Sequence, residues 1–248
     1  MHIVGHRGAR NLWPENSLSG FRKTAALPIE AVEFDVHQTR DNGLVVIHDP
    51  LFERTAEATG SVNAVTLKEA TAIALRDAGG DTVPTLDQVL DVYQDTTFEL
   101  HIELKTDHVG NPHPGMEGRI VDTIRRRRLE DRAILTCFAP EVLERIRAAW
   151  PGGRILASLD RRSAEMLGGI EPALERFKKI GNCLIAVERA LLSQTQDLCL
   201  KKIGGQSLGA WVPNEKPDIA HWMAQPIRSI TTDRPDLALE VRKSQAAA

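Results

Sequence analysis

The side chains best suited to chemistry in this 248-residue sequence lie at or just beyond the ends of short apolar runs. They comprise one imidazole, one guanidinium, three carboxylates and one ammonium group. In chain order they are His6, Arg7, Glu33, Asp35, Glu103 and Lys105. A second imidazole, His48, follows a short apolar run after an Asn-Gly pair. Side chains that bind metals, bind anions or transfer protons therefore recur at one kind of position in the chain.

The three carboxylates predict a metal site. Carboxylates held close together repel one another and raise each other's pKa values unless a cation offsets their charge. Oxygen ligands favour Mg²⁺ or Ca²⁺ over zinc, and the sequence has no cysteine pair or histidine pair at zinc-like spacing. We therefore predict that Glu33, Asp35 and Glu103 bind Mg²⁺ or Ca²⁺.

The basic and imidazole groups extend this prediction to phosphate chemistry. Arg7 and Lys105 beside such a cation would bind an anion, and the arginine fork suits phosphate oxygens. Because imidazole titrates near neutral pH, one of His6 and His48 can accept a proton from a nucleophile while the other donates to a leaving alkoxide. The cation and the basic groups would stabilise charge on the transferring phosphoryl group. The pattern indicates metal-assisted cleavage of a phosphodiester.

The elements that must position these groups follow a regular pattern. Eight short β-rich runs alternate with amphipathic helical segments, which is typical of a parallel α/β fold. The runs span residues 2–5, 31–36, 98–104, 133–137, 154–159, 183–187, 207–212 and 229–232. Eight strand-helix units predict a (β/α)8 TIM barrel, whose active site lies at the carboxyl ends of the strands.

One insertion interrupts the repeat after the second run. Asn42-Gly43 predicts a tight turn followed by a short strand, and the next helix begins only near Thr85. Successive strand residues alternate faces, so Glu33 and Asp35 are expected on one face, as Glu103 and Lys105 are on theirs. No linker-like stretch divides the chain, which predicts one domain over residues 1–248.

Composition limits the functions that fit. With 31 basic and 34 acidic residues the net charge is -3, which offers no global attraction to nucleic acid or an anionic membrane. The basic run 125–128 ends a helical pattern and meets acidic residues, so we expect a solvated helix end. Three scattered cysteines, no signal segment and no membrane-spanning stretch predict a cytoplasmic protein without disulfides. The oligomeric state, a homo-oligomer included, is left open.

Six motifs, in order between residues 5 and 236, resemble those of the glycerophosphodiester phosphodiesterase family. They are GHRGARNLWPENS, EFDVHQTRDNGLVVIHD, VPTLDQVL, HIELK, AWVPN and TTDRPD. The resemblance implies a TIM barrel that hydrolyses small glycerophosphodiesters to sn-glycerol 3-phosphate and an alcohol. It also implies that a glycerol hydroxyl of the substrate attacks first, giving a cyclic phosphate that water then opens.

The same resemblance implies roles for individual residues. It matches the two histidines to the family's acid/base pair, the three carboxylates to its metal ligands and the two basic residues to its phosphate contacts. It adds Glu15 as a supporting residue and Trp211 as a rim aromatic that packs against glycerol. Four further histidines near these motifs have no implied role, namely His37, His101, His108 and His113.

Two alternatives to this function stay open. A lysophospholipase D-like phosphodiesterase of the same barrel group predicts an apolar rim facing a membrane, whereas only 4% of the residues are aromatic. A catalytically silent phosphate-binding module predicts the loss of a histidine or a metal ligand, and the sequence has lost none. The sequence does not determine the alcohol head group or the choice between Mg²⁺ and Ca²⁺.

Overall fold

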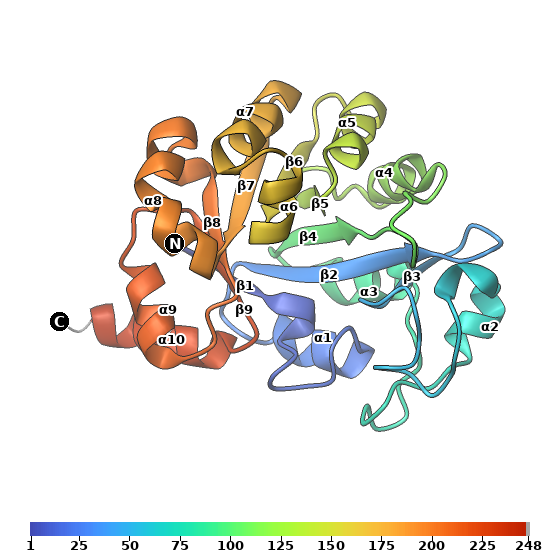
Figure 1. Cartoon of the computed structure of the whole chain (residues 1–248). Coiled ribbons are helices and arrows are strands. Elements are labelled where there is room, and N and C mark those ends of the chain that lie inside the picture. The colour runs from blue at the N-terminus through green and yellow to red at the C-terminus, as the bar shows by residue number, and fades with distance from the viewer. Residues whose placement is uncertain (247–248) are drawn as a thin grey trace.

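Eight parallel strands close into a barrel in the computed structural model, which describes residues 1–246 (Figure 1). The barrel strands are β1 His2–Gly5, β2 Ala31–Gln38, β4 Glu99–Leu104, β5 Ala133–Cys137, β6 Arg154–Leu159, β7 Cys183–Glu188, β8 Leu208–Trp211 and β9 Ser229–Thr232. The ring closes because β1 pairs with both β9 and β2. The predicted TIM barrel is confirmed, and each of the eight sequence runs forms one of its strands.

Helices cover the outside of this barrel (Figure 1). They are α1 Leu18–Ala25, α3 Leu86–Tyr93, α4 Met116–Arg127, α5 Pro140–Ala149, α6 Arg161–Met166, α7 Ile170–Ile180, α8 Arg189–Ile203, α9 Lys216–Met223 and α10 Pro235–Ala246. In α3 the buried positions are Leu86, Val89, Leu90 and Tyr93, the spacing that places apolar residues on one helix face. Short 3-10 turns lie at His6–Gly8, Val62–Ala64 and Gly205–Ser207.

Side chains of strand β2 alternate between the helix-covered outside and the interior of the barrel. Phe34 points outward, where its ring packs edge-on against Phe21 of α1 at a centroid distance of 5.7 Å. Its neighbours Glu33 and Asp35 therefore face the barrel interior. In the β2–β4 register Asp35 lies beside Glu103, so two carboxylates from strands far apart in sequence become neighbours.

The insertion after β2 forms a small lobe on the barrel. Strand β3 Leu44–Val46 pairs antiparallel with the end of β2 and lies outside the ring. The turn between them places Asn42 at φ 65°, the positive value that the Asn-Gly pair predicts. The short helix α2 Leu67–Thr71 follows, and a separate apolar cluster fills the lobe: Val45, Ile47, Phe52, Ala56, Val62, Ala70, Leu75, Ala78 and Val83. His48 belongs to this lobe rather than to a barrel strand.

The basic run at residues 125–128 lies at the end of helix α4, as the sequence predicts. In the basic run at the end of α4, Arg126 and Arg127 form ion pairs with Asp87, and Arg127 also pairs with Asp91. The three cysteines are free, as predicted. None of the helices within residues 1–246 is both long enough and apolar enough to cross a membrane.

Candidate active site

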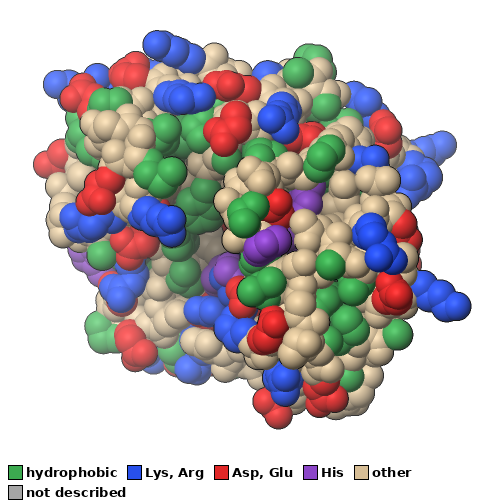
Figure 2. Space-filling view, turned by 45° about the vertical axis from the view of Figure 1, so that its right-hand side comes forward, with side chains coloured by type: hydrophobic (Ala, Val, Ile, Leu, Met, Phe, Trp, Pro, Cys, Tyr) green, Lys and Arg blue, Asp and Glu red, His purple; other side chains and the backbone are tan. Residues whose placement is uncertain are grey.

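A cavity of about 310 Å³ opens where the carboxyl ends of the barrel strands meet. Figure 2 shows a hollow beside which histidine side chains lie together with acidic and basic ones. The predicted residues that line the cavity are His6, Arg7, Glu33, His48, Glu103, Lys105 and Trp211. The structure thus brings most of the predicted site to one place.

The three predicted metal ligands meet at this cavity. Glu33, Asp35 and Glu103 each offer an oxygen within 4.8 Å of the other two, and all three side chains are buried. Desolvation, together with the charges of Asp35 and Glu103, raises the pKa of Glu33 well above its ordinary value. The three carboxylates are therefore close enough for their negative charges to disfavour the ionised form of Glu33.

Two basic side chains face the carboxylates. Lys105 Nζ lies 2.5 Å from Glu103 Oε1 and 3.1 Å from Asp35 Oδ1. Arg7 Nε lies 3.4 Å from Asp35 Oδ2, and the backbone N–H of Arg7 donates to Glu33 Oε2 at 3.0 Å. Although burial works against it, the charges of Asp35 and Glu103 hold the pKa of Lys105 above its ordinary value. Both basic groups are therefore cationic at neutral pH.

The carboxylate cluster fits a divalent cation. Glu33 Oε1 is buried and has no hydrogen-bond partner among residues 1–246, which leaves one acceptor of this carboxylate without a donor. An unpaired buried oxygen is costly, and a bound cation would satisfy it. The donors are all oxygens, the set that Mg²⁺ and Ca²⁺ prefer.

His6 is held by an aspartate from the far end of the chain. Its Nδ1 lies 2.5 Å from Asp233 Oδ1, and its Nε2 lies 3.8 Å from Glu33 Oε2. Asp233 is fully buried, accepts a hydrogen bond from Asn214 Nδ2 at 2.7 Å and forms an ion pair with Arg10 at 2.9 Å. Because Asp233 accepts a hydrogen bond from the Nδ1–H group, the Nε2 atom is the one available to a substrate. Burial lowers the pKa of His6, although the hydrogen bond to Asp233 acts in the opposite direction.

His48 has a similar arrangement built from the insertion. Its Nδ1 lies 2.6 Å from Asp49 Oδ1, and burial lowers its pKa below the ordinary value. Its backbone carbonyl accepts a hydrogen bond from His37 Nε2 at 3.1 Å. Since Nε2 of His37 must donate, its Nδ1 accepts from His113 Nε2 at 3.3 Å. His37 and His113 thus support the segment that carries His48.

The remaining predicted residues lie at the edge of the cavity. Glu15 Oε1 is 3.3 Å from Arg7 Nη1, and Glu15 precedes α1, whose N-cap is Ser17. The indole N–H of Trp211 donates to the carbonyl of Ala186 at 3.0 Å, and the ring packs edge-on against Phe138. Among the four unassigned histidines, His101 lines the inner part of the cavity and His108 is exposed.

Several residues that contact or support the two histidines had no role predicted from the sequence. Asp233 and Asn214 lie in the quoted motifs TTDRPD and AWVPN. The contact of Asp233 with His6 joins residues that are 227 positions apart, and Asn214 in turn donates to Asp233. Asp49 follows His48 directly, and an acidic neighbour of a candidate histidine is a usable signal. His37 and His113 gave no such signal, because their pairing depends on how the loop before α4 folds against the end of β2.

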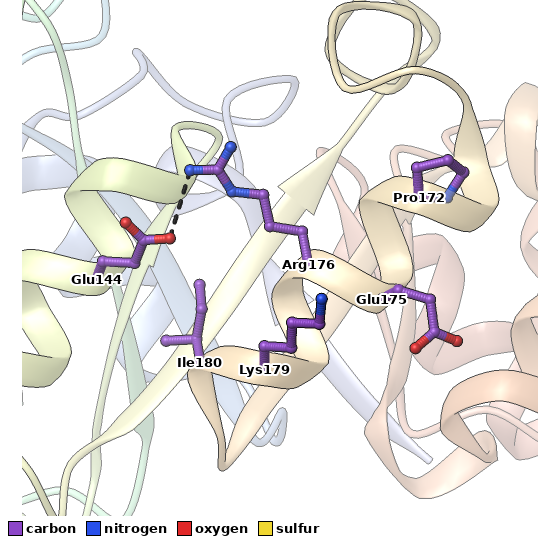
Figure 3. A pocket seen from close by; sticks show the side chains of 6 residues that line it. All are labelled: Glu144, Pro172, Glu175, Arg176, Lys179 and Ile180. Carbon is purple, nitrogen blue, oxygen red and sulfur yellow. Dashed lines mark hydrogen bonds and ion pairs between the residues drawn. The ribbon is translucent and has the colours of Figure 1, made fainter.

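A second cavity lacks the histidines and buried carboxylates of the first. It measures about 540 Å³ and lies on the outside of the barrel, where α7 faces α5 (Figure 3). Its walls are Glu144, Pro172, Glu175, Arg176, Lys179 and Ile180, and Arg176 forms an ion pair with Glu144 at 3.4 Å. It has no histidine and no buried carboxylate, so the barrel mouth remains the candidate site.

Comparisons with known proteins show the family of this chain. The model of the glycerophosphoryl diester phosphodiesterase family matches residues 6–237. A glycerophosphodiester phosphodiesterase of Caldanaerobacter subterraneus subsp. tengcongensis is 28% identical over 250 residues, which cover 97% of this chain and 98% of the relative. A solved structure from Agrobacterium tumefaciens, described as a candidate glycerophosphoryl diester phosphodiesterase, has a TM-score of 0.89 at 25% identity and covers 100% of this chain and 99% of its own.

Another solved structure extends the fold comparison. It is a phosphodiesterase of Oleispira antarctica in complex with the product sn-glycerol-3-phosphate. Its TM-score is 0.84 at 20% identity, and the match covers 98% of this chain and 97% of that one. At this level of identity the likeness concerns the fold.

Proposed function

The chain belongs to the glycerophosphoryl diester phosphodiesterase family, and on that premise we propose that it hydrolyses glycerophosphodiesters to sn-glycerol 3-phosphate and an alcohol. The observation that carries the proposal is the convergence at one cavity of three carboxylates, two basic groups and two histidines, each histidine paired with an aspartate. The small-molecule substrate class follows from the family and from the volume of the cavity, about 310 Å³.

Arg7 and Lys105 bind the phosphate group in this proposal. Both are cationic, both line the cavity, and both already contact carboxylates that a metal ion would partly neutralise. Their N–H groups would then donate to phosphate oxygens and stabilise charge in the transition state. Glu33, Asp35 and Glu103 would hold Mg²⁺ or Ca²⁺, which supplies Lewis-acid polarisation of a phosphoryl oxygen when bound.

His6 and His48 move the protons. Their lowered pKa values leave an imidazole neutral at pH 7, so one of them accepts the proton of a glycerol hydroxyl. That hydroxyl oxygen attacks phosphorus, and the alcohol leaves with a proton donated by the other histidine, whose hydrogen bond to its aspartate partner favours the protonated form against the effect of burial. Water then opens the cyclic phosphate with the two roles exchanged. Asp233 and Asp49 hold the ring orientations and stabilise each imidazolium as it forms.

Supporting roles complete the proposal. Trp211 stands at the rim with its ring held by Ala186 and Phe138, and we assign it to the apolar side of the glycerol group. Glu15 holds Arg7 from the outside of the cavity. The cytoplasmic location and the single domain stay predictions, as does the lysophospholipase D-like alternative.

The test is a product assay with controlled metal. Purified protein treated with EDTA is incubated with glycerophosphocholine, glycerophosphoethanolamine or glycerophosphoglycerol, then with Mg²⁺ or Ca²⁺ restored. We expect release of sn-glycerol 3-phosphate only after a divalent cation is added. Release of the alcohol from a lysophospholipid alone would favour the alternative, and no product from any substrate would contradict the proposal.

A further inference from the structure

The two candidate acid/base residues belong to different parts of the molecule. His6 follows β1, so the barrel itself fixes its position. His48 lies in the insertion lobe, whose apolar cluster is separate from that of the barrel. Proton transfer at one phosphate needs both rings within hydrogen-bond reach of the reacting oxygens. The position of His48 relative to the phosphate site therefore depends on how the lobe is fastened to the barrel.

Besides the hydrogen bond from His37 to the His48 carbonyl, one arginine joins the lobe to the barrel near His48. Arg54, from the lobe, donates to Asp49 from Nε at 2.5 Å and from Nη2 at 3.1 Å. The same guanidinium donates to Glu15 from Nη1 at 2.9 Å and from Nη2 at 2.7 Å. Four hydrogen bonds thus join a lobe carboxylate to a carboxylate of the loop after β1.

Both carboxylates act on proposed site residues. Asp49 Oδ1 lies 2.6 Å from His48 Nδ1, and Glu15 Oε1 lies 3.3 Å from Arg7 Nη1. A continuous chain of polar contacts therefore runs from His48 through Asp49, Arg54 and Glu15 to Arg7. Arg54 is not among the residues that line the cavity, and its side chain is 46% exposed.

Charge explains why this link needs an arginine. Without a cation between them, Asp49 and Glu15 would repel each other and separate. Among residues 1–246, Arg54 and His48 are the ion-pair partners of Asp49. A lysine would supply the charge but not the planar fork, which donates to two carboxylates at once.

We propose that Arg54 is a positioning residue that clamps Asp49 to Glu15 and so holds the His48 imidazole in place over the phosphate site. The proposal rests on the proposed function only for its kinetic readout. A ring displaced by about 1 Å can cost on the order of 10²-fold in rate, because the reacting geometry is lost. Arg54 would therefore affect the rate without touching the substrate.

The kinetic test compares Arg54→Ala and Arg54→Lys with a matched control, Arg176→Ala. Arg176 is also 46% exposed and also pairs with a glutamate, but it lies on the outer surface in Figure 3. We expect kcat to fall about 10-fold to 100-fold in Arg54→Ala while KM changes little, with partial recovery in Arg54→Lys and when guanidinium ion is added. The control should keep the wild-type kcat. A kcat for Arg54→Ala within twofold of wild type would overturn the proposal.

A second readout separates this proposal from the proposed function. The ring ¹⁵N and ¹H signals of His48, assigned by comparison with His48→Ala, report its hydrogen bond to Asp49 without any substrate. We expect Arg54→Ala to shift these signals and Arg176→Ala to leave them unchanged. An inactive wild-type enzyme would contradict the function alone, whereas unshifted His48 signals in Arg54→Ala would overturn the positioning role.

Discussion

Strand β4 carries one glutamate at each end of the barrel, and the two have opposite surroundings. Glu99, at the start of the strand, accepts from Arg154 at 2.6 Å and from Arg228 at 2.9 Å, and lies 3.2 Å from His2 Nδ1. Glu103, four residues later on the same face, shares Lys105 with Asp35. The amino end of the barrel therefore has more cations than carboxylates, while the carboxyl end has more carboxylates than cations.

The pKa values of Glu99, at the amino end, and Glu33, at the carboxyl end, are shifted in opposite directions. Burial alone would raise the pKa of Glu99, but His101, Arg154 and Arg228 together hold it well below its ordinary value. For Glu33, at the carboxyl end, burial and two neighbouring carboxylates raise the pKa instead. The carboxylate at the amino end thus has enough cations around it to stay ionised, whereas the carboxyl-end cluster lacks cations, as expected of a site that binds one.

The largest effect is expected from removing a histidine of the incomplete cluster. His48→Ala and His6→Ala should each lower kcat by about 10²-fold to 10⁴-fold, because proton transfer is lost while the carboxylates remain. Mn²⁺ titration should show metal affinity close to that of wild type in His48→Ala. Wild-type turnover in His48→Ala would remove the acid/base assignment.

Matched glutamine substitutions at the two ends should have opposite effects on stability. In the presence of EDTA, Glu99→Gln should lower the free energy of unfolding by about 1–3 kcal/mol, because charge-assisted hydrogen bonds to two arginines are weakened. Glu33→Gln should leave it unchanged or raise it, because a buried charge without sufficient partners is removed. Urea unfolding measures both.

Metal binding should separate the same two variants. Glu33→Gln should lose most of its affinity for Mn²⁺ and most of its activity, whereas Glu99→Gln should keep both. Equal losses of stability in the two variants, with metal affinity unchanged, would mean that the carboxyl-end cluster is only another structural ion pair.

A smaller effect concerns how these stability differences depend on pH. The folded-state pKa of Glu99 lies below the ordinary 4.5, so its contribution is present above pH 4.5 and is lost as pH falls toward the folded value. The folded-state pKa of Glu33 is raised, so its ionisation destabilises the metal-free protein as pH rises above 4.5. The deficit of Glu99→Gln should shrink in acid, and any advantage of Glu33→Gln should shrink there too. Parallel pH curves for both variants and wild type would contradict these ionisation states.

Local sequence pattern was sufficient to predict the barrel and its carboxylate cluster. Alternation along the second and third predicted strands puts Glu33, Asp35 and Glu103 on inward faces, and barrel closure makes those faces meet. Such patterns are periodic, and a closed parallel sheet admits few registers.

Residues outside the periodic segments could not be predicted in this way. The partners Asp233 of His6 and Arg54 of Asp49 come from loops, whose paths follow from tertiary packing rather than from a repeat. The insertion lobe has its own apolar cluster but no regular spacing, so its internal packing was not evident from the sequence.

The most direct test of the account is to locate a bound cation. Crystals of the protein soaked in Mn²⁺ would reveal the ion by its anomalous scattering. We expect one strong peak coordinated by oxygens of Glu33, Asp35 and Glu103 at the mouth of the barrel. No peak there at saturating Mn²⁺, or a single peak on carboxylates elsewhere in the molecule, would contradict it.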